Sequence, residues 1–172
     1  MSVLKNVVVL TLILIGSFVD AIVYSATSNV AISPRIEQAC YRGSIEDVVD
    51  MVNRAEKLID EVGSELAFRQ FMVAEGGFIR GDLYVFAIDQ QGTIVANGAA
   101  PISVGRNSLQ ARDQTGYYFV KDMLVRASRS GSGWVRYQWF SPCTGKMSMK
   151  RVYFKRLGHH VVGVGSYSPL DI

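Results

Sequence analysis

The chain has 172 residues, of which 49% are hydrophobic and 19% charged, values typical of one globular domain with a core of its own. Its formal net charge is +3 at pH 7, and the sequence lacks the sustained basic stripe of a protein that binds by neutralising phosphates. Length, composition and charge therefore argue for a single domain and against nucleic acid as a partner.

The first residues have the pattern of an export signal. Lys5 supplies a positive charge, residues 7–19 are an almost unbroken apolar run, and small residues follow at Ala21 and Ala26. We predict that residues 1–26 are a signal peptide, cleaved after Ala21 or Ala26. The mature protein would then be periplasmic or secreted.

An uncleaved membrane anchor is the alternative for the same segment. Residues 7–24 would hold the protein in the inner membrane, although a span needs about 20 apolar residues and Asp20 interrupts the run. Residues 27–43 form the lead-in to the domain. Cys40 and Cys143 are an even pair in an exported chain, which favours a disulfide between them, while two separate thiols are the alternative.

Helical and strand patterns then follow one another along the chain. Ser44 is a typical N-cap with acidic residues after it, and apolar residues recur with helical spacing as far as Leu66. This predicts one long helix with one side in water. A shorter helix is predicted at 117–128 and strands at 82–89, 93–97, 134–140, 149–157 and 161–167. The order predicts an α+β domain with an antiparallel sheet.

Side-chain alternation in the last strands points to a candidate binding site. Alternate residues of a strand face opposite ways. This turns Lys150, Val152 and Phe154 towards the core, and it turns Arg151, Tyr153 and Lys155 towards solvent. A symmetric loop would place Tyr137 opposite Lys150 and Trp139 one step diagonal. A cation beside a phenol and an indole N–H suits a small carboxylate in an apolar pocket. The alternative is a lysine at a strand end whose amine reaches water.

Five stretches of the sequence together resemble the single Cache domain, the extracytoplasmic sensor module of bacterial chemoreceptors and histidine kinases. They are DLYVFAIDQQGTIVANG, DQTGYYFVKDML, GSGWVRYQWFSP, KRVYFKR and VVGVGSY, and the resemblance covers about residues 44–168. It implies a PAS-like fold in which a long N-terminal helix packs on a five- or six-stranded antiparallel sheet. It also implies binding of short carboxylates such as acetate, propionate or pyruvate. The candidate ligand-binding residues are Lys150, Tyr137, Trp139 and Tyr84.

The sequence departs from the family in two respects. Many relatives carry a His after the second strand, where this chain has Asn97-Gly98, and the sequence stops at Ile172, where a receptor would continue into a transmembrane helix. We therefore expect residues 44–172 to form a stand-alone exported sensor. It would bind a small organic acid and present the complex to a membrane receptor or kinase, as in chemotaxis and other signal transduction.

Two other functions stay open: a protein-interaction module with a vestigial pocket, and an enzyme of unrecognised type. The sequence contains no GxSxG, no HExxH and no glycine-rich phosphate loop. His159 and His160 are neighbours at a strand start and point to opposite faces, a poor arrangement for a metal. We expect no enzymatic activity, no metal and no cofactor, and the oligomeric state does not follow from the sequence.

Overall fold

The computed structural model of the chain describes residues 41–170. The signal peptide, its cleavage sites and Cys40 lie outside the described residues. Export and the boundaries of the signal and lead-in segments therefore stay predictions. Within residues 41–170, no helix combines the length and apolar character needed to cross a bilayer.

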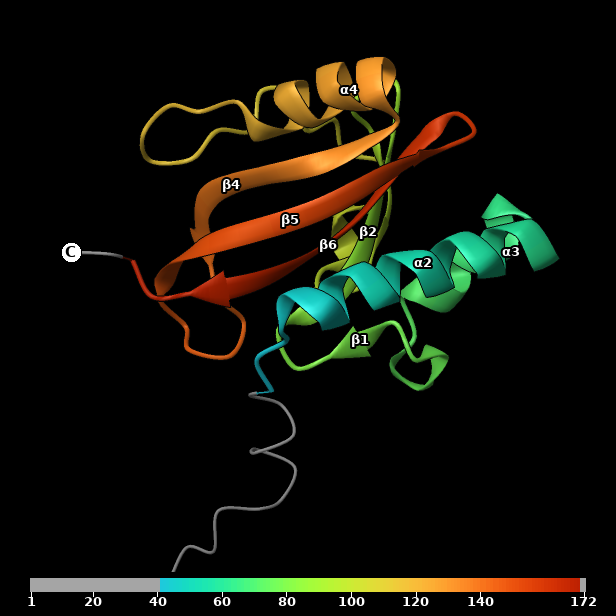
Figure 1. The fold of residues 1–172 in the computed structure, drawn as a ribbon, viewed down its shortest axis with the longest axis horizontal. Coiled ribbons are helices and arrows are strands. Elements are labelled where there is room, and N and C mark those ends of the chain that lie inside the picture. Colours follow the sequence, from blue (N-terminus) through green and yellow to red (C-terminus); the bar gives the residue numbers. More distant parts are fainter. Residues whose placement is uncertain (1–40, 171–172) are drawn as a thin grey trace, which may run out of the picture. The chain divides into compact units, whose positions relative to one another are not determined.

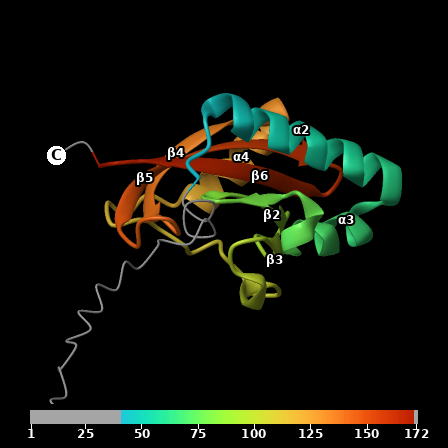
Figure 2. The same ribbon diagram turned by 90° about the horizontal axis from the view of Figure 1, so that it is seen from below.

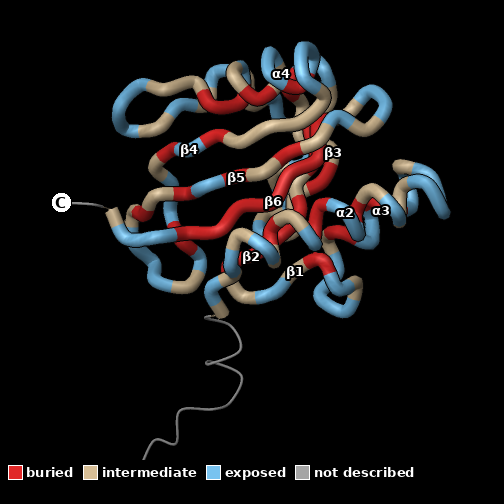
Figure 3. The backbone as a smooth tube through the Cα atoms, viewed as in Figure 1, coloured by how far each residue is buried: buried red, intermediate tan, exposed pale blue. Residues whose placement is uncertain are grey.

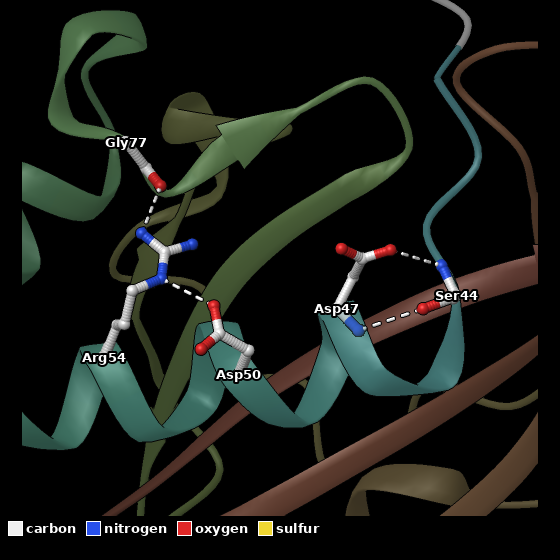
Figure 4. Close-up of polar contacts among 5 residues, drawn as sticks. All are labelled: Ser44, Asp47, Asp50, Arg54 and Gly77. Atoms are coloured by element: carbon white, nitrogen blue, oxygen red, sulfur yellow. Dashed lines mark hydrogen bonds and ion pairs between the residues drawn. The ribbon is translucent and has the colours of Figure 1, made fainter.

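The helix that starts the domain, α2 (Ile45–Val62), begins at the cap predicted from the sequence. The Ser44 side-chain oxygen accepts the Asp47 backbone N–H at 3.1 Å, and the Asp47 carboxylate accepts the Ser44 backbone N–H at 2.8 Å (Figure 4). This reciprocal pair satisfies two backbone donors that would otherwise lack partners at the helix start.

The long helix predicted to reach Leu66 ends earlier, at Gly63, and a second helix, α3 (Ser64–Phe71), follows directly. Gly63 has a φ of +81°, a conformation that costs glycine little, and its N–H still bonds to the carbonyl of Ile59. The apolar spacing runs on across this break because α3 also buries its apolar face. The apolar periodicity therefore predicts helix on both sides of Gly63, but it does not reveal the break between the two helices.

Six antiparallel strands form one sheet in the order β1-β2-β6-β5-β4, with β3 paired to β2 (Figure 1). The strands are β1 (Ile79–Arg80), β2 (Leu83–Asp89), β3 (Ile94–Asn97), β4 (Ser132–Phe140), β5 (Met147–Leu157) and β6 (His160–Ser168). Short 3-10 turns lie at Ala74–Gly76 and Pro101–Ser103. The predicted α+β architecture with an antiparallel sheet is confirmed, and the two-residue β1 is too short to leave a pattern in the sequence.

Helices cover both faces of the sheet, and Figure 2 shows α2 along one of them. Helices α2 and α3 cover one face of the sheet. Val52 and Phe71 of these helices share a core there with Val164 of β6. On the other face, helix α4 (Phe119–Ser130) packs through Val120 and Met123 against β4 and β5. Figure 3 shows buried residues along the inner strands between these layers. Strands that alternate between two covered faces therefore place their side chains in two separate cores.

The prediction that Tyr153 and Lys155 face solvent is wrong. Both are half-buried beneath α2, and the Lys155 amine lies 2.6 Å from the Glu56 carboxylate and 3.0 Å from the Asn53 side-chain oxygen. Arg151, on the same face, is exposed as predicted. Alternation shows which residues share a face of the sheet, but it does not show which part of that face a helix covers.

The loop between β4 and β5 carries Cys143, and because Cys40 lies outside the described residues the disulfide stays a prediction. The Cys143 thiol lies 3.8 Å from the carbonyl oxygen of Tyr41. Closing a loop of about 100 residues stabilises a domain by ~4–5 kcal/mol in the chain-entropy model. We expect protein purified without reductant to be lighter by two hydrogens than the reduced chain. Two alkylatable thiols in that preparation would contradict the pairing.

Candidate ligand-binding site

A cavity of about 180 Å³ lies between the sheet and α4. We call it the Lys150 cavity. Its apolar wall consists of Phe86, Ile88, Ile94, Ala111, Phe119, Val120 and Met123. Its polar lining consists of Tyr84, Asn97, Ser108, Tyr137, Trp139 and Lys150. The cavity is thus mostly apolar with a few polar groups, as is usual for small-molecule sites.

The four residues that the sequence singled out line this one cavity. Lys150 is only 2% exposed and pairs directly with Tyr137 across β4 and β5, in the register expected from a symmetric loop. Trp139 pairs with Ser148, one step along, and lies at the rim with 38% of its surface exposed. Tyr84 comes from β2 and is buried. The alternative of a lysine whose amine reaches water is therefore wrong.

The Lys150 amine is surrounded by aromatic groups and forms no ion pair with any residue that the structure describes. Its Nζ donates to the Tyr84 hydroxyl at 2.6 Å, and that hydroxyl is hydrogen-bonded to the Tyr167 hydroxyl at 3.1 Å. Nζ also lies 4.1 Å from the Tyr84 ring centroid and 5.1 Å from that of Tyr167. Among residues 41–170, no carboxylate lies within ion-pair distance of this amine. A buried ammonium without a counter-ion favours an anion at the same place.

Two glycines of β6 create the space that the lysine and its neighbour occupy. A Cβ at Gly165 would lie 2.5 Å from Lys150 Cε, and a Cβ at Gly163 would lie 2.6 Å from the Phe86 ring. Larger residues at either position would displace these side chains from the cavity wall. The glycines of the VVGVGSY stretch therefore have a packing role at the site.

Tyr137 is fixed from above by α4. Its ring stacks on Phe119 with centroids 3.9 Å apart and planes within 6°, and Trp139 meets Phe119 edge-on at 5.2 Å. Burial raises the pKa of the Tyr137 hydroxyl well above its ordinary value, so the group keeps its proton at neutral pH. It can donate a hydrogen bond into the cavity. The sequence analysis did not identify Phe119. Apolar spacing predicts that α4 has a buried face, but it does not show which strand that face contacts.

Asn97 is the residue noted above as a departure from the family's His. Its side chain forms hydrogen bonds within the turn that follows it. Its amide nitrogen donates to Ser103 Oγ at 3.1 Å, and its oxygen accepts the backbone N–H groups of Ala99 and Ala100 at 3.1 and 3.2 Å. Ser108, also in the lining, donates its hydroxyl to the Gly92 carbonyl at 2.7 Å. Both residues therefore shape loops, and the other polar residues of the lining are Lys150, Tyr84, Tyr137 and Trp139.

A second concave region runs along the outer strand β4. This β4 groove has a volume of about 720 Å³ and is lined by three arginines, Trp134 and residues of the loop before α4, among others. It is open, and its arginines Arg126, Arg136 and Arg151 lie at the surface. The Arg151 guanidinium stacks 4.7 Å above the Trp134 ring. Within residues 41–170, no group of three His, Cys, Asp or Glu side chains could hold a metal.

The chain thus folds into an α+β domain, in which a buried lysine lines a mostly apolar cavity between a six-stranded antiparallel sheet and a helix. A family model described as a Cache domain matches residues 72–171. The chain belongs to the Cache domain family. The comparison with curated proteins found no match.

Solved structures share this fold at low sequence identity. A methyl-accepting chemotaxis protein from Vibrio parahaemolyticus RIMD 2210633 is 20% identical, with a TM-score of 0.61 over 71% of this chain and 86% of that chain. A Cache chemosensory domain described as recognising carboxylic acid is 18% identical, with a TM-score of 0.60 over 71% and 91%. A periplasmic sensor domain of a chemotaxis protein is 20% identical, with a TM-score of 0.53 over 71% and 88%.

Proposed function

We propose that this domain is an extracytoplasmic sensor that binds a small organic acid with one carboxyl group in the Lys150 cavity. The observation that carries the proposal is the buried Lys150 amine, which opens onto an apolar cavity and has no carboxylate partner among the described residues. A bound carboxylate would supply the missing counter-ion. The solved Cache domain described as recognising carboxylic acid supports this choice of ligand class.

The size and the lining of the cavity narrow the ligand further. Its volume of about 180 Å³ corresponds to about six water molecules at ~30 Å³ each, which suits a short acid and excludes a peptide. Lys150 is the one cationic residue in the lining. A second carboxylate on the ligand would therefore lie against apolar side chains such as Val120 and Met123, at a large desolvation cost.

Export, the cleaved signal peptide and the membrane partner belong to the same proposal. Sensor domains of chemotaxis proteins share the fold, which supports a place outside the cytoplasm and a receptor or kinase as the partner of the loaded domain. Cache domains are sensor domains, and we propose no enzymatic activity. The ligand would act by changing the surface that the domain presents to that partner.

A thermal-shift screen tests the binding function. We would compare acetate, propionate, butyrate and pyruvate with the matched neutral amides and with succinate. A ligand at 100 times its Kd stabilises the domain by about 2.7 kcal/mol, which raises Tm by roughly 8 °C at about 3 °C per kcal/mol. We expect one or more of the short acids to give this shift, and the amides and succinate to give none. Equal shifts with an acid and its amide, or no shift with any acid, would contradict the proposal.

The β4 groove favours a second candidate function, a protein-interaction module. Arg151 stacks on Trp134 there, and arginine and tryptophan are the residue types most enriched among strong contributors to protein–protein interfaces. A screen without any hit would leave this groove as the stronger functional surface. The two functions are compatible, because the groove and the Lys150 cavity share only Tyr137.

A further inference from the structure

We propose that Asp82 couples the Lys150 cavity to the segment that leads into α2, so that an anion bound at Lys150 loosens the hold on residues 41–43. The inference rests on the proposed function in one respect, namely that the anion is the carboxylate of a small acid. The coupling between Lys150 and this segment can be tested without any ligand. It would give a binding event inside the domain an effect on the chain that precedes α2.

Asp82 holds the lead-in segment through both its backbone and its side chain. Its N–H donates to the Tyr41 carbonyl at 2.9 Å, and its carboxylate accepts the Gly43 N–H at 2.9 Å. Asp82 is fully buried in the turn between β1 and β2. We call these contacts the lead-in junction.

The lead-in junction has no spare room. A Cβ at Gly81 would overlap the Tyr41 carbonyl oxygen, and a Cβ at Gly43 would overlap the Leu83 side chain. Gly81 also has a φ of +62°, which glycine adopts without strain. The Arg80 guanidinium stacks 3.7 Å from the Tyr41 ring centroid and closes the junction from outside. A shift of the turn that carries Asp82 must therefore move the lead-in segment or break its hydrogen bonds.

The other side of Asp82 faces the ligand-binding groups. The Tyr167 backbone N–H lowers the pKa of the Asp82 carboxyl group, and Tyr167 pairs with Lys150 across β5 and β6. The Tyr167 hydroxyl bonds to the Tyr84 hydroxyl, which accepts from the Lys150 amine. Tyr84 is itself two residues from Asp82 along the chain. Both hydroxyl groups next to the Lys150 amine thus belong to residues adjoining the Asp82 turn.

The Lys150 cavity and the lead-in junction are connected by charge as well as by hydrogen bonds. The Asp82 Oδ2 atom is buried and has no hydrogen-bond partner among the described residues, so nearby cations help to keep the carboxylate ionised. Burial raises the pKa of Asp82, the backbone N–H groups of Gly43 and Tyr167 lower it, and the Arg42 and Lys150 charges lower it further. The hydroxyls of Tyr41 and Tyr167 are the other titratable groups on which Asp82 acts. An anion that neutralises Lys150 would make the carboxylate a weaker acceptor for Gly43.

Hydrogen exchange of single backbone amides, measured by NMR on the full mature chain, tests the coupling. Lys150→Met removes the cation, as a bound anion would neutralise it, and Tyr167→Phe is a milder variant that removes the hydroxyl link. We expect the Gly43 amide to exchange about 5-fold faster or more in both variants, relative to the amide of Ala127 in α4. Lys155→Met, on the opposite face of β5, is the control and should leave the ratio unchanged.

A second arm separates coupling from general destabilisation. In an Asp82→Asn background the Gly43 amide should already exchange fast, and adding Lys150→Met should change its rate no further. An unchanged Gly43 rate in both Lys150→Met and Tyr167→Phe would overturn the inference, as would an undiminished effect of Lys150→Met in the Asp82→Asn background. Either outcome leaves carboxylate binding untouched, because the screen with short acids measures that function independently.

Discussion

Lys150→Met is expected to weaken binding of the short acid by about 10- to 150-fold while the domain stays folded. A charge-assisted hydrogen bond to a carboxylate contributes roughly 1.5–3 kcal/mol, and this range converts to that loss of affinity. Methionine keeps the unbranched stem that fills the space left by Gly165 and removes the buried ammonium. Titration calorimetry of the wild type and the variant, with the acid that scores in the screen, measures the effect.

Lys155→Met is the matched control for this experiment. Lys155 lies in the same strand, but it faces α2 and pairs with Glu56, away from the Lys150 cavity. Its loss should leave the affinity unchanged and reduce the free energy of unfolding by about 1 kcal/mol or less. Equal affinities of the wild type and Lys150→Met would mean that the acid binds elsewhere, and the β4 groove would then be the next place to search.

Gly165→Ala is expected to abolish most of the binding by a steric route. The added methyl group would lie 2.5 Å from Lys150 Cε and 2.8 Å from Val152 Cγ2, so the lysine stem must move. Overpacking of this kind lowers the free energy of unfolding by roughly 1–3 kcal/mol. Displacing the amine should weaken binding by about 10-fold or more, equivalent to about 1.4 kcal/mol. Chemical denaturation and calorimetry measure the two effects separately.

Gly133→Ala separates the loss of binding from the loss of stability. A Cβ at Gly133 would lie 3.0 Å from the tip of the Phe154 ring, on the same face of the sheet but outside the cavity lining. This variant should lose some stability and keep its affinity. Wild-type binding by Gly165→Ala would show that the position of the Lys150 amine does not set the affinity.

The part of the site that could be predicted from the sequence is the part that follows from strand geometry. Alternation turned Lys150 inward, and a symmetric loop set it opposite Tyr137, and both expectations are confirmed. These are local properties, because the pleat and a short hairpin loop decide them over a few residues. The same reasoning placed Trp139 near the cavity, where it lines the rim.

Other features depend on contacts between distant segments and left no usable pattern. Phe119 meets Tyr137 only because α4 crosses β4, and Tyr167 meets Tyr84 only because β6 lies between β2 and β5. Asn97 was noted from the sequence only as a departure from the family pattern, and its amide is occupied by the turn that follows it. Apolar spacing likewise could not reveal the bend at Gly63.

A crystal structure of the domain with its bound acid tests the central claim most directly. The proposed function predicts that one carboxylate oxygen lies within about 3 Å of Lys150 Nζ, the usual length of a charge-assisted hydrogen bond. It also predicts that the hydrocarbon tail lies against Phe119 and Met123 in the Lys150 cavity. An acid bound outside this cavity, or one whose carboxylate points away from Lys150, would contradict it.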